Sequence, residues 1–174
     1  MSPRLKARIT GALYFLSLLT GLFADYFFHD KAYTAGLLEI SGMIAVTLLL
    51  YAIFRPVNKS LALLAASLNL VAMIFEAQRV NPQGQGVGLV IHGMSFIVFA
   101  YLIFRSTFLP RILGVLLAIA GLGWLTYLST PFQNYNLGIC LFGEGSVMLW
   151  LLVMGVNDQR WKERANAAGA STRT

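Results

Sequence analysis

Four ionisable residues lie within long apolar stretches of this chain, and their presence there needs an explanation. They are three carboxylates and one imidazole, namely Glu39, Glu76, His92 and Glu144. A charged side chain at the centre of a bilayer costs roughly 2.5–3.5 kcal/mol on insertion scales, so such residues usually mark a functional site. Carboxylates beside an imidazole suit proton coupling, binding of a cation, or acid–base chemistry.

The apolar stretches that must position these residues are each about as long as a bilayer is thick. Hydrophobic residues make up 57% of the chain and charged residues 11%, whereas soluble domains are about 45–50% apolar and about a quarter charged. Crossing the hydrocarbon core takes roughly 20 helical residues. Because the stretches are continuously apolar rather than alternating, we expect an all-α integral membrane bundle of six transmembrane helices. The expected spans are Ile9–Phe28, Gly36–Phe54, Leu61–Ala77, Val87–Phe104, Ile112–Ser129 and Leu137–Val156.

The six spans leave room for one domain, residues 1–156, followed by a polar tail, residues 157–174. The composition of the tail predicts one or two helical turns that fade into disorder. The first span follows a basic segment, as a secretory signal would, but it is near full spanning length and lacks a small-residue cleavage site, so we expect a retained helix. The single cysteine, Cys140, can form no internal disulfide and is expected to pack as a small apolar residue.

Basic residues fall almost entirely in alternate loops. Only Lys31 and Arg79 lie on the other side. The positive-inside rule applies well to loops this short. It predicts that the chain lies in the inner membrane with both termini in the cytoplasm. The net charge of +6 follows from this topology. We expect the basic residues to interact with the lipid bilayer and its anionic headgroups, and we expect no nucleic-acid partner. The basic residues of the cytoplasmic side are Arg4, Lys6, Arg8, Arg55, Lys59, Arg105, Arg111, Arg160, Lys162, Arg164 and Arg173.

Small residues recur at helical spacing in two of the spans. One stripe runs through Gly84, Gly88 and His92, and the other joins Gly114 with Ala118 and Gly121. Such stripes let helix backbones approach closely in lipid, and we expect both to serve packing.

Several short segments together resemble one catalogued family. The strongest is the ten-residue segment 105–114, RSTFLPRILG, and further similar features are Arg8–Gly11, Arg55–Lys59, Glu76, His92-Gly93, Gly143-Glu144 and Trp150–Leu152. The chain resembles, over nearly its whole length, the bacterial membrane family called domain of unknown function 4386. This resemblance implies a multi-pass bacterial inner-membrane protein of about this length, and it implies no activity.

The expected topology places all four ionisable residues in the outer half of the bilayer. One interpretation is that they only hold the bundle together, with Glu144 paired to His92 or Arg79. The other is an outward-opening polar pocket, with Glu144 and His92 at its base and Glu76 and Glu39 on its wall. We favour the pocket, because Glu144 lies too deep for its short side chain to reach the interface.

A pocket of this kind indicates binding or transport of a small ligand, a lipid or a cation. The alternatives are an intramembrane enzyme that uses Glu144 as general acid or base with His92 as its partner, and a passive subunit without a site. No cofactor and no metal are expected, because the chain lacks His-x-x-x-His and Cys-x-x-Cys spacings. No catalytic nucleophile has a recognisable motif. Six short helices are also compatible with a homo-oligomer.

Overall fold

Seven α-helices and no β-strand make up the described residues of the computed structural model, which are 1–27, 32–77, 82–126 and 133–171. Side chains are described for residues 1–21, 34–77, 86–126 and 137–170. The all-α class expected from the sequence is confirmed. The helices are α1 (Pro3–Phe27), α2 (Ala32–Phe54), α3 (Lys59–Ala77), α4 (Pro82–Arg105), α5 (Arg111–Leu125), α6 (Gln133–Val153) and α7 (Asp158–Ser171).

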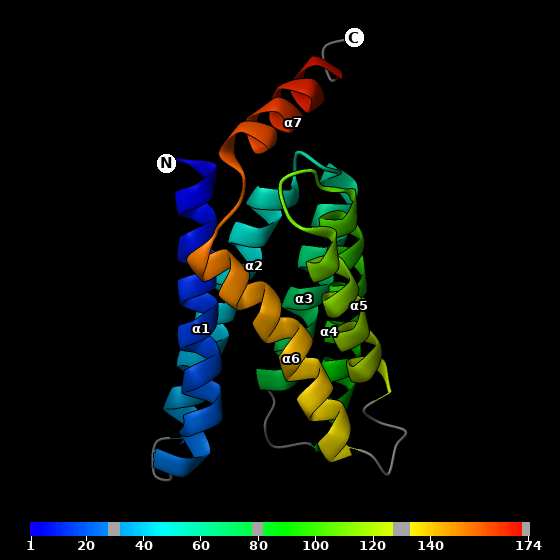
Figure 1. Ribbon diagram of the computed structural model, residues 1–174. Helices are drawn as coiled ribbons and strands as arrows, with labels where there is room; N and C mark the ends of the chain where they lie inside the picture. Colours follow the sequence, from blue (N-terminus) through cyan, green and yellow to red (C-terminus); the bar gives the residue numbers. More distant parts are fainter. Residues whose placement is uncertain (28–31, 78–81, 127–132, 172–174) are drawn as a thin grey trace.

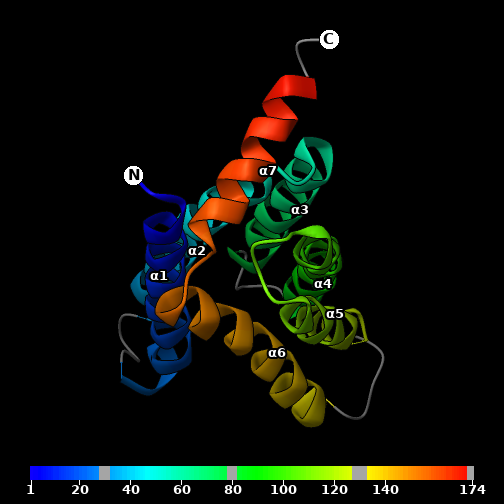
Figure 2. The same cartoon turned by 45° about the horizontal axis from the view of Figure 1, so that its top comes forward.

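The first six helices form a closed ring in the order of the chain. Each helix packs against the next one, and α6 packs back against α1, as the view in Figure 2 shows. Short connections make sequence neighbours antiparallel neighbours in space. Both chain termini therefore lie at the same end of the bundle (Figure 1), which we call the termini end. Because the ring is closed, every helix presents one face to a shared interior.

Glycines allow a close crossing between α4 and α5. A Cβ atom added to Gly93 would lie 2.6 Å from the carbonyl oxygen of Gly121, and one added to Gly121 would lie 2.9 Å from that of Gly93. A Cβ on Gly114 would lie 2.9 Å from the carbonyl oxygen of Ala100. The stripe that contains Gly114 and Gly121 therefore packs against α4, as the sequence predicts. The surroundings of Gly84 lie outside the described side chains.

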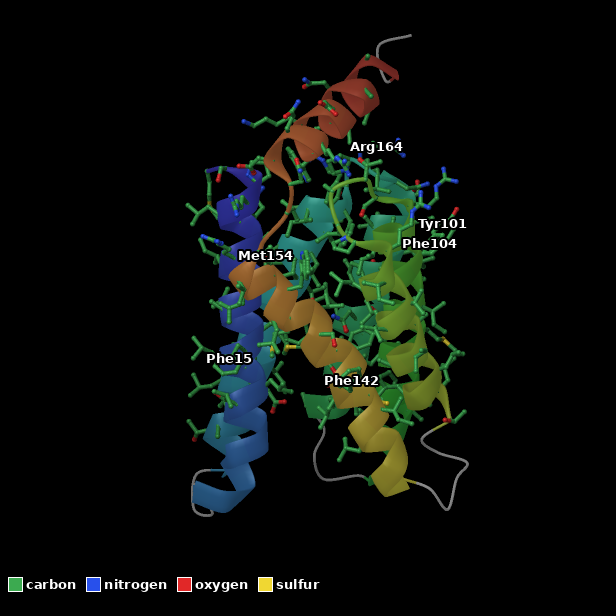
Figure 3. The ribbon with its side chains drawn as sticks, viewed as in Figure 1. Phe15, Tyr101, Phe104, Phe142, Met154 and Arg164 are labelled. Atoms are coloured by element: carbon green, nitrogen blue, oxygen red, sulfur yellow. The ribbon has the colours of Figure 1, made fainter. Side chains whose placement is uncertain are left out.

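Large apolar side chains cover the outer surface of the ring. Tyr101 and Phe104 lie at the edge of the bundle in Figure 3, and Phe142 on α6 is 69% exposed. Soluble monomers rarely expose contiguous apolar patches of more than a few hundred Å². Such a surface suits lipid better than water. Further exposed apolar residues on the six helices include Leu16, Leu38, Leu48, Leu63, Ile74, Met94, Ile112, Leu122 and Leu149.

Three of the described helical segments are long and apolar enough to cross a membrane: Thr34–Phe54, Lys59–Ala77 and Gly86–Arg105. A fourth results if Leu137–Val153 and Asp158–Ala170, bent by 100° relative to each other, count as one broken span. Helix α5 has 15 residues and ends at Leu125, with Thr126 as its C-cap, so it stops short of the fifth span expected to run to Ser129; residues 127–129 lie outside the described residues. The membrane character is thus supported by three to four helices.

All six helices of the ring begin earlier than the spans drawn from hydropathy, and two of them begin at a proline. The expected first span begins at Ile9 and the fourth at Val87, but α1 begins at Pro3 and α4 at Pro82. Proline is favoured at the first position of a helix, because its fixed φ suits the helix and its missing N–H would have no partner there. Hydropathy marks the part of a helix that suits lipid, whereas these first turns are polar.

The C-terminal tail is more ordered than its composition predicts. The expectation of one or two turns is wrong, because α7 has 14 residues. Gly155, with a φ of 70°, follows the end of α6 and lets the chain change direction. Asn157 then caps α7, its side-chain oxygen accepting a hydrogen bond from the amide of Arg160 at 3.1 Å. Capping of this kind is a local effect that a hydropathy pattern does not register.

Side chains attach α7 to the ring. The indole N–H of Trp161 donates to the carbonyl oxygen of Ile53, near the end of α2, at 2.9 Å. The amide of Arg4 donates to the carboxylate of Asp158 at 2.6 Å. These bonds place α7 above the termini end of the bundle, where Figure 1 shows it.

In the half of the bundle near the termini, buried aromatic rings form part of the apolar core. Phe54 is buried between Phe99 and Phe108, with ring centroids 5.9 and 6.1 Å apart. Cys140 also belongs to the core, and its thiol lies 3.4 Å from the carbonyl oxygen of Ala120. Its position agrees with the packing role expected from the sequence.

Candidate functional site

A cavity of about 160 Å³ lies inside the ring, in the half of the helices that points away from the termini. All six helices of the ring contribute to its wall. Glu39, Glu76, His92 and Glu144, singled out in the sequence, all line it. The structure therefore brings the four ionisable residues to one enclosure, and their role in binding stays a prediction. The other described lining residues are Tyr14, Leu18, Ile40, Met43, Met73, Leu89, Trp124 and Leu141.

Glu144 is held by a tyrosine that sequence reasoning did not include in the site. Its side chain projects from the middle of α6, is buried, and accepts a hydrogen bond from the hydroxyl group of Tyr14 on α1. The contact exists because the ring closes by packing α6 against α1. The sequence carries a weak signal for it, since Tyr14 and Gly21 lie two turns apart on one face of their helix. The expected pairing with Arg79 lies outside the described residues.

His92 faces a different carboxylate from the one expected. Its Nδ1 atom lies 3.8 Å from Oε1 of Glu76, which is too long for a hydrogen bond. Both atoms are buried, and neither has a hydrogen-bond partner within the described part of the chain. Buried polar atoms are nearly always bonded, so a pair without partners beside a cavity indicates room for a water molecule or a ligand group.

Aromatic rings fix the position of the imidazole. The ring of Phe96, one turn further along α4, packs with its centroid 4.3 Å from that of His92. Trp124 on α5 meets His92 edge-on, with centroids 6.4 Å apart. The close crossing at Gly93 and Gly121 brings these two helices near enough for that contact. His92 is therefore a fixed part of the wall with one nitrogen directed at Glu76.

Two glycines make room for the remaining carboxylates. A Cβ atom added to Gly21 on α1 would collide with the carboxylate of Glu39 on α2. A Cβ added to Gly88 on α4 would lie 2.9 Å from Cγ of Glu76 and 3.0 Å from the carbonyl oxygen of Ala72. The glycine at position 88, expected to serve helix packing, therefore also accommodates a carboxylate of the site.

A second polar contact lies two helical turns from Glu76 toward the termini end. The side-chain amide of Asn69 donates to the hydroxyl oxygen of Thr47 at 2.9 Å, and both residues are buried. This bond joins α3 to α2 inside the ring. Beyond it, toward the termini, the aromatic core of Phe54 and Phe99 fills the interior.

The charge balance of the cavity favours positively charged ligands. Three carboxylates and one histidine line it, and no lysine or arginine is among its described lining residues. Carboxylates enclosed by a protein need a counter-charge or a proton to offset their loss of hydration. The chemistry available here is therefore recognition of a cation or exchange of protons.

Comparison with known proteins agrees with the sequence resemblance. Residues 70–155, about half of the chain, match the family described as domain of unknown function DUF4386. Over these residues the chain belongs to that family. The matched segment includes Glu76, His92 and Glu144, whereas Tyr14 and Glu39 precede it.

An uncharacterized protein of the archaeon Archaeoglobus fulgidus is similar to this chain. It is 26% identical over 123 residues, which cover 64% of this chain and 76% of that protein. No solved structure matches the chain. Since this relative is archaeal, the bacterial origin implied by the resemblance stays a prediction.

Proposed function

We propose that the protein is a multi-pass inner-membrane protein that binds or transports a small organic cation in the cavity of its helical ring. In this proposal all six helices of the ring cross the membrane, both termini lie in the cytoplasm, and the cavity opens outward. The observation that carries the proposal is the set of three carboxylates around one cavity, beside the buried Glu76 and His92 atoms that lack hydrogen-bond partners.

The size of the cavity favours a small ligand over a lipid. Pockets for drug-sized molecules usually measure about 300–1,000 Å³, and this one measures about 160 Å³. A lipid headgroup with its acyl chains needs more space than that. An ion with a few carbon atoms, such as a methylated ammonium, is of the right order.

The walls favour an organic cation over a metal ion. Trp124 presents an aromatic ring to the cavity, and Met43 and Met73 add polarizable apolar surface. Aromatic rings attract ammonium groups that carry methyl substituents. In the described part of the chain, no three His, Cys, Asp or Glu side chains lie close enough to ligate a metal.

The charge distribution along the helices supports the orientation. The basic side chains flank the ends of α1, α2, α4 and α6 that share the termini end, and the positive-inside rule assigns that end to the cytoplasm. The cavity lies in the other half of the bundle, and the aromatic core around Phe54 closes its way to the termini end. Entry from the outside is the arrangement that fits both features.

The test is a titration of the purified full-length protein with tetramethylammonium, using its fluorescence or the heat of binding. We expect saturable binding that Glu144→Gln weakens by about tenfold or more, since the substitution replaces a carboxyl group that can carry charge with a neutral amide and keeps the shape of the side chain. Glu163→Gln, on the exposed surface of α7, is the matched control and leaves the affinity unchanged. Absence of binding to the parent, or equal affinity in Glu144→Gln, would overturn the proposal.

A further inference from the structure

A second group of ionisable residues lies at the termini end, far from the cavity. Lys6 on α1, Arg55 after α2 and Lys59 at the start of α3 line one open pocket of about 520 Å³. Tyr51 and Trp161 form aromatic parts of its wall. We call this the basic groove. No aspartate or glutamate is among its described lining residues.

The charges of the basic groove are not taken up by contacts within the described part of the chain. None of the three side chains forms an ion pair or a hydrogen bond with the described part of the chain. Arg8 differs from them, because its guanidinium donates to the carbonyl oxygen of Val153 at 2.8 Å. The positive charge of the groove is therefore available to a ligand from outside the chain.

Two further features increase the positive potential of the groove. An adjoining pocket of about 480 Å³ shares Arg55 and Lys59 and adds Arg164 from α7. Lys59 is also the first residue of α3, so the positive end of that helix dipole lies beside the groove. Four cationic side chains and a helix N-terminus thus surround one region.

The helix surfaces below the groove are apolar, which distinguishes a lipid from a soluble anion. Along α2, Ile44, Leu48 and Tyr51 precede Arg55 at spacings that put all four on one stripe, and Leu48 is 54% exposed. Leu63 lies one turn from Lys59 on α3 and is also 54% exposed. A headgroup in the groove would therefore have its acyl chains along an apolar surface.

We infer that the basic groove binds the phosphate headgroup of an anionic phospholipid from the cytoplasmic leaflet. Basic pockets beside membrane helices on the cytoplasmic side suit such headgroups, and each lysine or arginine near the surface contributes to the attraction. Tyr51 and Trp161 stand where aromatic residues usually meet the lipid interface. This site is separate from the cavity and does not depend on any cation bound there.

The test compares two double variants that remove the same charge from the same end of the molecule. Arg55→Gln with Lys59→Gln removes two cations of the groove. Arg105→Gln with Arg111→Gln is the control, since both arginines are exposed and lie outside the groove, over the rings of Tyr101 and Phe104. The affinity of the detergent-solubilised full chain for phosphatidylglycerol and for phosphatidylcholine is measured by native mass spectrometry.

We expect the parent to bind phosphatidylglycerol more tightly than phosphatidylcholine. The groove variant should bind phosphatidylglycerol about 20- to 30-fold more weakly than the parent, because each removed cation lowers the affinity roughly fivefold. The control variant keeps its affinity to within about twofold. An equal loss in both variants would show general charge attraction and overturn the inference. Competition by inorganic phosphate at equal potency would assign the groove to a soluble anion instead and overturn the lipid assignment. Melting temperatures in phosphatidylcholine show whether each variant is folded.

Discussion

The two halves of the helical ring differ sharply, although the same six helices build both. Near the termini, Phe54, Phe99 and Phe108 fill the interior with aromatic rings. In the other half, the same ring surrounds a cavity lined by Tyr14 and four ionisable residues, including Glu144. The difference shows that the aromatic core and the polar cavity, which we propose as the binding site, are separated along the axis of the bundle.

This separation has a physical reason. Apolar burial drives helix association only weakly in lipid, because lipid tails are as apolar as leucine, so close packing has to supply the stability. Enclosed charges lower stability unless a ligand or proton compensates them. A bundle that keeps its dense core around Phe54 can therefore tolerate an incompletely bonded pair such as Glu76 and His92 in its other half.

The largest effect is expected in the packed half. Phe54→Ala removes a buried ring and leaves a void, and we expect the free energy of unfolding to fall by about 3–5 kcal/mol. The measurement is unfolding in mixed micelles. Phe142→Ala is the control, because that ring is 69% exposed and lipid or detergent replaces its contacts; it should change the free energy by less than about 1 kcal/mol. Equal losses in the two variants would contradict a core concentrated near the termini.

A medium effect is expected where the helices cross beside the cavity. A Cβ atom on Gly143 would collide with the carbonyl oxygen of Leu116 on α5, whereas Gly145, half a turn further along α6, has open space around it. We expect Gly143→Ala to lower the free energy of unfolding by about 1–3 kcal/mol through overpacking. Gly145→Ala should leave it unchanged or raise it by up to about 1 kcal/mol, since alanine favours helix. A loss in Gly145→Ala as large as that in Gly143→Ala would disprove the close crossing.

The smallest effect is expected in the polar half. Tyr14→Phe removes the hydroxyl group that bonds Glu144 and keeps the ring, and we expect a loss of about 1 kcal/mol in the free energy of unfolding. Tyr101→Phe, at an exposed ring, is the control and should have no measurable effect. If tetramethylammonium binds Glu144, its stabilising effect should also decrease in Tyr14→Phe. An unchanged stability and an unchanged ligand effect would show that the Tyr14 bond has no role in the cavity.

The sequence predicts which ionisable residues lie together in the half of the ring that contains the cavity. Glu39, Glu76, His92 and Glu144 were identifiable because charged groups within apolar stretches share one reason to avoid lipid, and a closed ring offers one interior. Tyr14 was not, because a tyrosine is common near membranes and carries no charge to mark it. Which carboxylate faces His92 depends on how the helices are rotated, and hydropathy does not define that rotation.

The C-terminal tail, by contrast, has structure that the sequence pattern does not predict. Its polar composition predicts little structure, yet α7 is a helix of 14 residues. The cap at Asn157 and the bond from Trp161 to Ile53 supply the order. The first depends on one side chain and the second on a contact between residues 108 positions apart. Neither produces a periodic pattern along the chain.

Closure of the ring through α6 and α1 has a consequence for the connectivity of the chain. These two helices are neighbours, and the end of α6 lies beside the first turns of α1, where Arg8 donates to the carbonyl oxygen of Val153. The covalent order of the six helices is thus one of several cyclic orders that would give the same packing. A circularly permuted chain, with a linker in place of α7 joining α6 to α1 and new ends opened near Asn58, would retain every interface between the six helices of the ring and the direction of each of them.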